Sequence, residues 1–80
     1  MRRDDVKVSG VNSELQKTVG RRVRERRLAA GLSQEAMAES LGYHRTYLGS
    51  LERGERNLTL ASLEQLAARL GVDPLDLLRD

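Results

Sequence analysis

Residues 34–53 read QEAMAESLGYHRTYLGSLER, and this stretch decides the fold. Its apolar residues recur at helical spacing on either side of Gly42, which predicts two short helices joined by a turn. Glycine suits the turn because its backbone readily adopts a positive φ, and Ala38 lets the two helices cross closely. The apolar residues that close the angle between the helices are Met37, Leu41, Tyr43, Leu48 and Leu51.

Helical periodicity and capping residues predict three further helices outside this stretch. One covers residues 13–30, one covers residues 60–70, and a short one begins at the Asp73-Pro74 pair. Gly20 lies inside the first of them, where glycine costs roughly 1 kcal/mol relative to alanine. The inward apolar residues are expected to be Leu15, Val19, Val23 and Ala30, then Leu60, Leu63, Leu66, Ala67 and Leu70. Because no segment alternates with period two, the predicted fold class is all-α, with five helices.

The composition of the chain excludes several classes of protein and of binding site. Residues 1–12 have no consistent period and are expected to form a flexible N-terminal arm, so that the domain covers residues 13–80. The chain has no cysteine and a single histidine, which excludes disulfides and leaves no candidate metal site. No nucleophile with an acid–base pair is apparent, so we expect neither an enzyme nor a cofactor or small-molecule ligand. The absence of a long apolar run and of a secretory leader predicts a cytoplasmic protein with no membrane partner.

Basic residues are concentrated in the first part of the chain. Residues 1–57 hold twelve Lys and Arg against eight Asp and Glu, whereas residues 58–80 hold two against four. This distribution suits a protein that turns one face toward a polyanion, and it is equally typical of charges that only solvate a surface. The charge pattern by itself therefore leaves both interpretations open.

The second helix of the quoted stretch carries a more specific signal. The side opposite Leu48 and Leu51 presents small hydrogen-bonding residues and arginines, namely Arg45, Thr46, Gly49, Ser50 and Arg53. A passive solvent face would be richer in Glu and Lys, whereas these side chains can approach base edges in the major groove of DNA. Because glycine adds no bulk, Gly49 is expected to let the helix sit close to the groove floor.

Three segments resemble a known family: GLSQE at 31–35, GYHRTYL at 42–48 and LERGERN at 51–57. They are similar to the lambda-repressor-like, or xenobiotic-response-element, helix-turn-helix family, and the resemblance covers residues 15–78. Within that family the chain most resembles the controller proteins of restriction-modification systems. Those proteins are short dimers that regulate their own gene and the endonuclease gene.

The resemblance implies a role in DNA binding for each matching residue. Arg45, Thr46 and Ser50 would read base edges together with Gly49, and Arg45 would contact a guanine. The DNA backbone would be contacted by Gln34, Tyr47, Arg53, Arg56, Asn57 and Thr59. For Tyr47, contact with a thymine methyl group is an alternative.

Two charged residues near this surface have structural interpretations. Glu52 lies about 40° from Leu48 on the helical wheel and should be largely buried, so it needs a cationic partner. Periodicity does not separate Arg26 from Arg27, but the family's pattern implies a structural ion pair between Arg27 and Glu52. His44 is expected to be a helix cap or a neighbour of a DNA phosphate; as a cap it is unusual, because the family more often has Ser, Thr or Asp there.

The carboxyl end predicts self-association. A short helix cannot bury all its apolar residues against one small domain, so we expect Val72, Leu75 and Leu78 at a homodimer interface. A dimer would place two recognition helices about 34 Å apart on a palindromic operator in double-stranded DNA. The sequence thus predicts a sequence-specific transcriptional regulator. The alternative is an antitoxin or co-activator module whose main partner is a protein, for which residues 1–12 are the only candidate wrapping segment.

Overall fold

The computed structural model describes the backbone of residues 8–79 and the side chains of residues 14–79. Its elements are α1 (Val8–Ala29), α2 (Gln34–Leu41), α3 (Arg45–Glu52), α4 (Leu60–Leu70) and the 3-10 helix η2 (Pro74–Leu77). No strand occurs among these residues, which confirms the all-α class. The predicted count of five helices is wrong, because the described part of the chain forms four α-helices and a single 3-10 turn.

The last element is a 3-10 turn because it is too short to form α-helical hydrogen bonds. The Asp73 side chain accepts from Leu75 N at 2.9 Å and caps the segment, as the Asp-Pro pair predicts. The backbone then bonds three residues back, from Asp76 N to Asp73 O and from Leu78 N to Leu75 O. Four residues do not offset the cost of nucleating an α-helix.

Helix α1 begins at Val8, five residues earlier than the start expected at Ser13. Residues 8–12 were predicted to belong to a flexible arm, but their backbone is helical; residues 1–7 of that arm lie outside the described residues. Once the middle of α1 is held by packing at Val19 and Val23, each added residue gains one hydrogen bond without a new nucleation cost. Ser13 is therefore an interior residue of the helix.

Helix α2 is capped at both ends, whereas α3 has no side-chain cap at its start. The Ser33 hydroxyl accepts from Ala36 N at 3.0 Å at the start of α2. Gly42 ends α2 with φ 78°, and the next amide, Tyr43 N, returns to Ala38 O at 2.8 Å. His44 occupies the N-cap position of α3, but its side chain makes no capping hydrogen bond.

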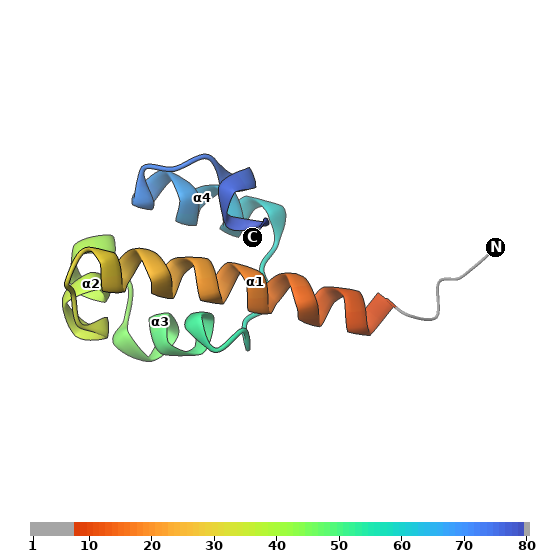
Figure 1. Ribbon diagram of the computed structural model, residues 1–80, viewed down its shortest axis with the longest axis horizontal. Helices are drawn as coiled ribbons and strands as arrows, with labels where there is room; N and C mark the ends of the chain where they lie inside the picture. Colours follow the sequence, from red (N-terminus) through yellow and green to blue (C-terminus); the bar gives the residue numbers. More distant parts are fainter. Residues whose placement is uncertain (1–7, 80) are drawn as a thin grey trace.

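Helix α1 runs through the middle of the molecule, with α4 on one side, α3 on the other, and α2 at the carboxyl-terminal end of α1 (Figure 1). The buried apolar residues are Val19, Val23, Met37, Ala38, Leu48, Leu51, Leu63, Leu66, Ala67 and Leu77. Three residues expected to face inward do not: Leu15 is 46% exposed, Leu60 is 80% exposed, and Ala30 is exposed. Leu60 and Ala30 lie at helix termini, and the amino-terminal part of α1 projects past the other helices (Figure 1).

The backbones of α1 and α3 meet at Gly20. A Cβ atom added at Gly20 would lie 2.4 Å from Leu51 O and 2.6 Å from Glu52 O, closer than real Cβ contacts. Only glycine permits this approach, which explains why the helix retains a residue of low helical propensity at this position. Within the part of the chain that the structure describes, no helix has the length and apolarity needed to cross a membrane.

Candidate nucleic-acid interface

The first turn of α3 carries the most accessible of the predicted base readers. Arg45 and Thr46 are both exposed there, and the turn holds no acidic residue that would neutralise the arginine. Because α3 is packed on α1 through Leu48 and Leu51, both of which are buried, this turn is held at a fixed angle to the rest of the domain. The Arg45 guanidinium and the Thr46 hydroxyl therefore face solvent from one rigid helix.

Gly49 does not lie on the open face of α3, as the helical wheel suggested. It is buried, and a Cβ there would lie 3.3 Å from Arg53 Nη1 and 3.6 Å from Gln34 Oε1. The start of α2 covers this side of α3, a contact that the periodicity of α3 alone does not reveal. Gly49 therefore gives room to its neighbours Gln34 and Arg53 rather than an open surface for a groove floor.

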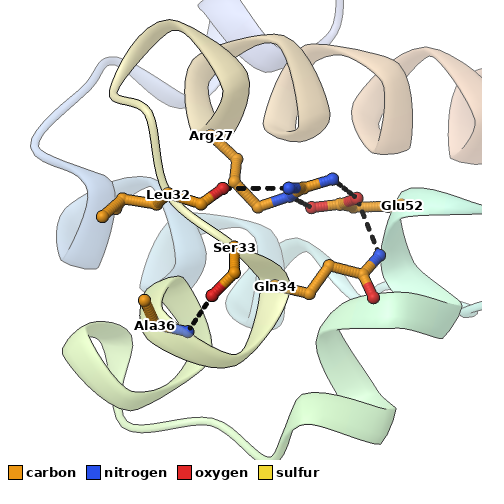
Figure 2. A network of polar contacts seen from close by, with 6 residues as sticks. All are labelled: Arg27, Leu32, Ser33, Gln34, Ala36 and Glu52. Carbon is orange, nitrogen blue, oxygen red and sulfur yellow. Dashed lines mark hydrogen bonds and ion pairs between the residues drawn. The ribbon is translucent and has the colours of Figure 1, made fainter.

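A buried ion pair connects α1 to α3 beneath this surface (Figure 2). Arg27 Nε donates to Glu52 Oε2 at 2.7 Å and Nη2 donates to Glu52 Oε1 at 3.0 Å. The side chains are 10% and 3% exposed, whereas Arg26 is exposed to solvent. The hydrogen bonds to Glu52 are the main cause of the raised pKa of Arg27, and burial opposes them.

The ion pair also orients the first residue of α2. Gln34 Nε2 donates to Glu52 Oε1 at 3.0 Å, and Arg27 Nη1 donates to Leu32 O at 3.0 Å just before α2 (Figure 2). The Gln34 side chain, which the family resemblance assigns to a DNA phosphate, is thus fixed by a buried carboxylate. Sequence reasoning missed this link, because the two residues are far apart in the chain and nothing in their spacing signals it.

Ser50 and Arg56 touch each other, although they were assigned to bases and to the DNA backbone respectively. Arg56 Nε donates to Ser50 Oγ at 2.9 Å, and the Arg56 guanidinium lies 4.8 Å from the centroid of the Tyr47 ring. The Ser50 hydroxyl in turn donates to Tyr47 O at 2.8 Å. With its hydrogen used in this way, Ser50 has only acceptor capacity left for a ligand.

A second tyrosine and a second arginine continue this arrangement. The rings of Tyr43 and Tyr47 are 5.0 Å apart at 43°, and the Arg69 guanidinium lies 4.7 Å from the Tyr43 centroid. Burial raises the pKa of Tyr43, and the nearby positive charge of Arg69 opposes this. The sequence indicated Tyr43 only as a core residue; its contact with α4 has no signal in the chain.

The other residues predicted to contact the DNA backbone are exposed, and each has a hydrogen-bond or ion-pair partner within the protein. Arg53 pairs with Glu55 at 3.1 Å on the surface, and Asn57 Oδ1 accepts from Gln16 Nε2. The Thr59 hydroxyl accepts from Ser62 N at 3.0 Å as the cap of α4. Because an exposed ion pair is worth little, exchanging the Arg53–Glu55 pair for a phosphate contact costs the protein little.

The carboxyl end leaves apolar surface uncovered. Leu75 is 59% exposed and Val72 and Leu78 are half-buried, whereas Leu77 is fully buried in the core. Next to Leu78 lies an open groove of about 300 Å³, whose other lining residues include Leu15, Asn57, Leu58 and Leu60. Among the described residues, no three His, Cys, Asp or Glu side chains come together as they would around a metal ion.

Comparison with known proteins gives consistent matches. A family model described as helix-turn-helix matches residues 23–77. Control protein C.BamHI of Bacillus amyloliquefaciens is 45% identical over 60 residues, which is 74% of either chain. Control protein C.SmaI of Serratia marcescens is 47% identical over 57 residues, 71% of this chain and 68% of that one. The crystal structure of the restriction-modification controller protein C.AhdI from Aeromonas hydrophila aligns with a TM-score of 0.65 and 44% identity, over 78% of this chain and 94% of that one.

Proposed function

The chain belongs to the helix-turn-helix family of DNA-binding transcriptional regulators, and from this premise we propose that it is a restriction-modification controller protein that binds an inverted-repeat operator as a dimer. The observation that carries the proposal is the first turn of α3, where Arg45 and Thr46 are exposed on a helix anchored in the core. The names of the relatives favour a regulator over a module whose main partner is a protein.

In this proposal α3 enters the major groove and α2 lies across the DNA backbone. Arg45 donates to guanine O6 and N7, while Thr46 and the free lone pair of Ser50 contact neighbouring base edges. Gln34, held by Glu52, donates to a phosphate beside the amino terminus of α2. The other backbone ligands are Tyr47, Arg53, Arg56, Asn57 and Thr59, and their cationic members make the affinity fall as salt rises.

Selection of the purified protein against a random DNA pool at near-physiological salt tests the function. We expect enrichment of an inverted repeat whose half-site centres are about ten base pairs apart, one turn of the duplex. A pool that remains random after selection would contradict sequence-specific binding. The enriched repeat then serves as the operator for the measurements below.

Replacing Arg45 with alanine should remove base reading while leaving general DNA affinity in place. We expect Arg45→Ala to weaken operator binding by about 1–3 kcal/mol and to change binding to random DNA much less. Arg79→Ala is the matched control, because it removes one exposed positive charge from the end of the chain. Fluorescence anisotropy with both DNAs measures the effect, and an equal loss on both would contradict the assignment of Arg45 to a base.

The apolar surface at the carboxyl end supports the proposed dimer. Leu75→Glu would place a carboxylate in the interface formed by Val72, Leu75 and Leu78, and we expect the dimer dissociation constant to rise about 100-fold or more. Leu28→Glu is the matched control, because Leu28 is 53% exposed on α1 and lies outside this cluster. Sedimentation equilibrium distinguishes the two variants. A Leu75→Glu protein that remains dimeric would contradict this interface.

A further inference from the structure

The two tyrosines lie between two arginines in a continuous series that we call the tyrosine stack: Arg69, Tyr43, Tyr47 and Arg56. The Arg69 guanidinium carbon lies 4.7 Å from the Tyr43 ring centroid, the two ring centroids are 5.0 Å apart, and the Arg56 guanidinium carbon lies 4.8 Å from the Tyr47 centroid. The series starts in the last turn of α4, passes the turn between α2 and α3, and ends beside the recognition helix. It therefore connects α4 to the surface proposed to bind DNA.

We propose that Arg69 is a positioning residue for DNA binding, acting through Tyr43 and Tyr47 on Arg56 without touching DNA itself. This inference rests on the proposed function, because it needs Tyr47 and Arg56 to be DNA ligands.

The guanidinium group of Arg69 makes two contacts within the protein. Its Nη1 donates at 2.9 Å to the carbonyl of Leu41, the last residue of α2. Carbonyls at the end of a helix lack helical partners and carry the negative end of the helix dipole, so a cation is well placed there. Its guanidinium plane also lies over Tyr43. Both contacts hold Arg69 at the turn between α2 and α3.

Tyr43 connects Arg69 to α3 through its contact with the Tyr47 ring. Its ring is half-buried against the core and its amide bonds Ala38 O, while Arg69 and Tyr47 contact the rest of the ring. Ring pairs at this separation attract one another, which orients Tyr47 in the first turn of α3 next to Arg45 and Thr46. The Tyr47 ring thus contacts a residue of the preceding turn, and that residue in turn contacts Arg69 of α4.

Arg56 lies at the other end of the stack and depends on the Tyr47 ring. It follows α3 in an irregular segment, and the ring and the Ser50 hydroxyl are what hold its guanidinium against the recognition helix. A long side chain that is ordered before binding loses less conformational entropy when it meets a phosphate or base. Loss of Arg69 should therefore weaken DNA binding although Arg69 itself makes no DNA contact.

The composition of the chain makes the stack directly observable. The protein contains two tyrosines and no tryptophan, phenylalanine or cysteine, so its near-ultraviolet circular dichroism arises from Tyr43 and Tyr47. A change in this signal in the free protein reports on the stack, independently of DNA binding. A role of Arg69 in overall stability alone would appear instead in the melting temperature.

The experiment compares Arg69→Met, which removes the charge, with Arg69→Lys, which keeps the charge but not the planar guanidinium. Arg79→Met is the control for the loss of one positive charge, and operator affinity is measured at several salt concentrations. We expect both Arg69 variants to weaken operator binding by about three- to tenfold, the size of one cation–aromatic contact, with an unchanged salt slope. Their near-ultraviolet dichroism should change, and in a Tyr43→Leu background Arg69→Met should add no further loss of affinity.

Two results would overturn the inference. If lysine restores affinity and methionine lowers the salt slope by about 0.9, Arg69 contacts a phosphate directly. If affinity is unchanged while only the melting temperature falls, Arg69 serves the fold alone. Failure of the wild type and of Arg79→Met to bind any operator would instead contradict the proposed function, so the two failures are distinguishable.

Discussion

Replacing Glu52 with leucine is expected to lower the free energy of unfolding by about 3–5 kcal/mol, because it leaves Arg27 buried without its counter-charge. The Arg27 side chain is 10% exposed and also bonds Leu32 O, so little water reaches its guanidinium to replace the carboxylate. A domain of this size has a total stability of about 4–12 kcal/mol, so the loss is a large part of the whole. Urea denaturation followed by far-ultraviolet circular dichroism measures it.

Two further variants show whether the loss arises from an unpaired buried charge. Replacing both partners, Arg27→Met with Glu52→Leu, should recover much of the loss, because no buried charge then remains unpaired. Glu25→Leu breaks the exposed pair of Arg22 and Glu25 and should change stability by at most about 1 kcal/mol. If Glu52→Leu costs no more than Glu25→Leu, the guanidinium of Arg27 is not held in the interior.

Gly20→Ala is expected to destabilise the protein by about 2–3 kcal/mol, although alanine is the better helix former. The added methyl group would meet the backbone carbonyls of Leu51 and Glu52, which cannot rotate away as a side chain would. Overpacking typically costs about 1–3 kcal/mol and occasionally more; because this Cβ would lie 2.4 and 2.6 Å from two backbone oxygens, we expect a cost above that range, which exceeds the gain of roughly 1 kcal/mol in helix propensity. The melting temperature should fall by about 10–20 °C in a domain of this size.

Gly31→Ala is the control for the Gly20 prediction. It makes the same chemical change at a position with φ 71°, where a Cβ would meet nothing within 4 Å. The cost there is only that of a left-handed backbone, about 1–2 kcal/mol. A Gly20→Ala protein that melts at a higher temperature than the wild type would show that propensity outweighs the crossing of α1 and α3.

The candidate DNA ligands fall into two groups. Arg45 and Thr46 are exposed in the first turn of α3, whereas Ser50, Arg56 and Asn57 already have hydrogen-bond partners in the free protein. The second group is ordered before DNA arrives, which lowers the entropy cost of binding but requires that some internal bonds be exchanged. This difference is why Arg45→Ala should have a simpler effect than substitution of Arg56.

The main features of the fold were predictable because they depend on local chemistry. A serine before α2, a threonine before α4, and glycines at the ends of both helices act within a few residues of their own position. The segment after Asp73 was predicted to be a fifth helix but forms only a 3-10 turn, because an Asp-Pro pair indicates where a helix starts and not how many helical residues follow. The inward assignment of Leu60 failed because periodicity gives the side of a helix and not the length over which a neighbour covers it.

The sequence by itself determined the class, the helix-turn-helix and the position of the recognition helix, since these follow from spacing and capping along the chain. It also indicated that Glu52 is buried and, through the family resemblance, that Arg27 is its partner. Only the tertiary structure decided which side chains meet across helices: Gln34 with Glu52, Arg56 with Ser50, and Arg69 with Tyr43. These contacts depend on the angles and distances at which whole helices pack. Gly20 determines one of those distances, because without a Cβ atom it lets α1 and α3 approach closely.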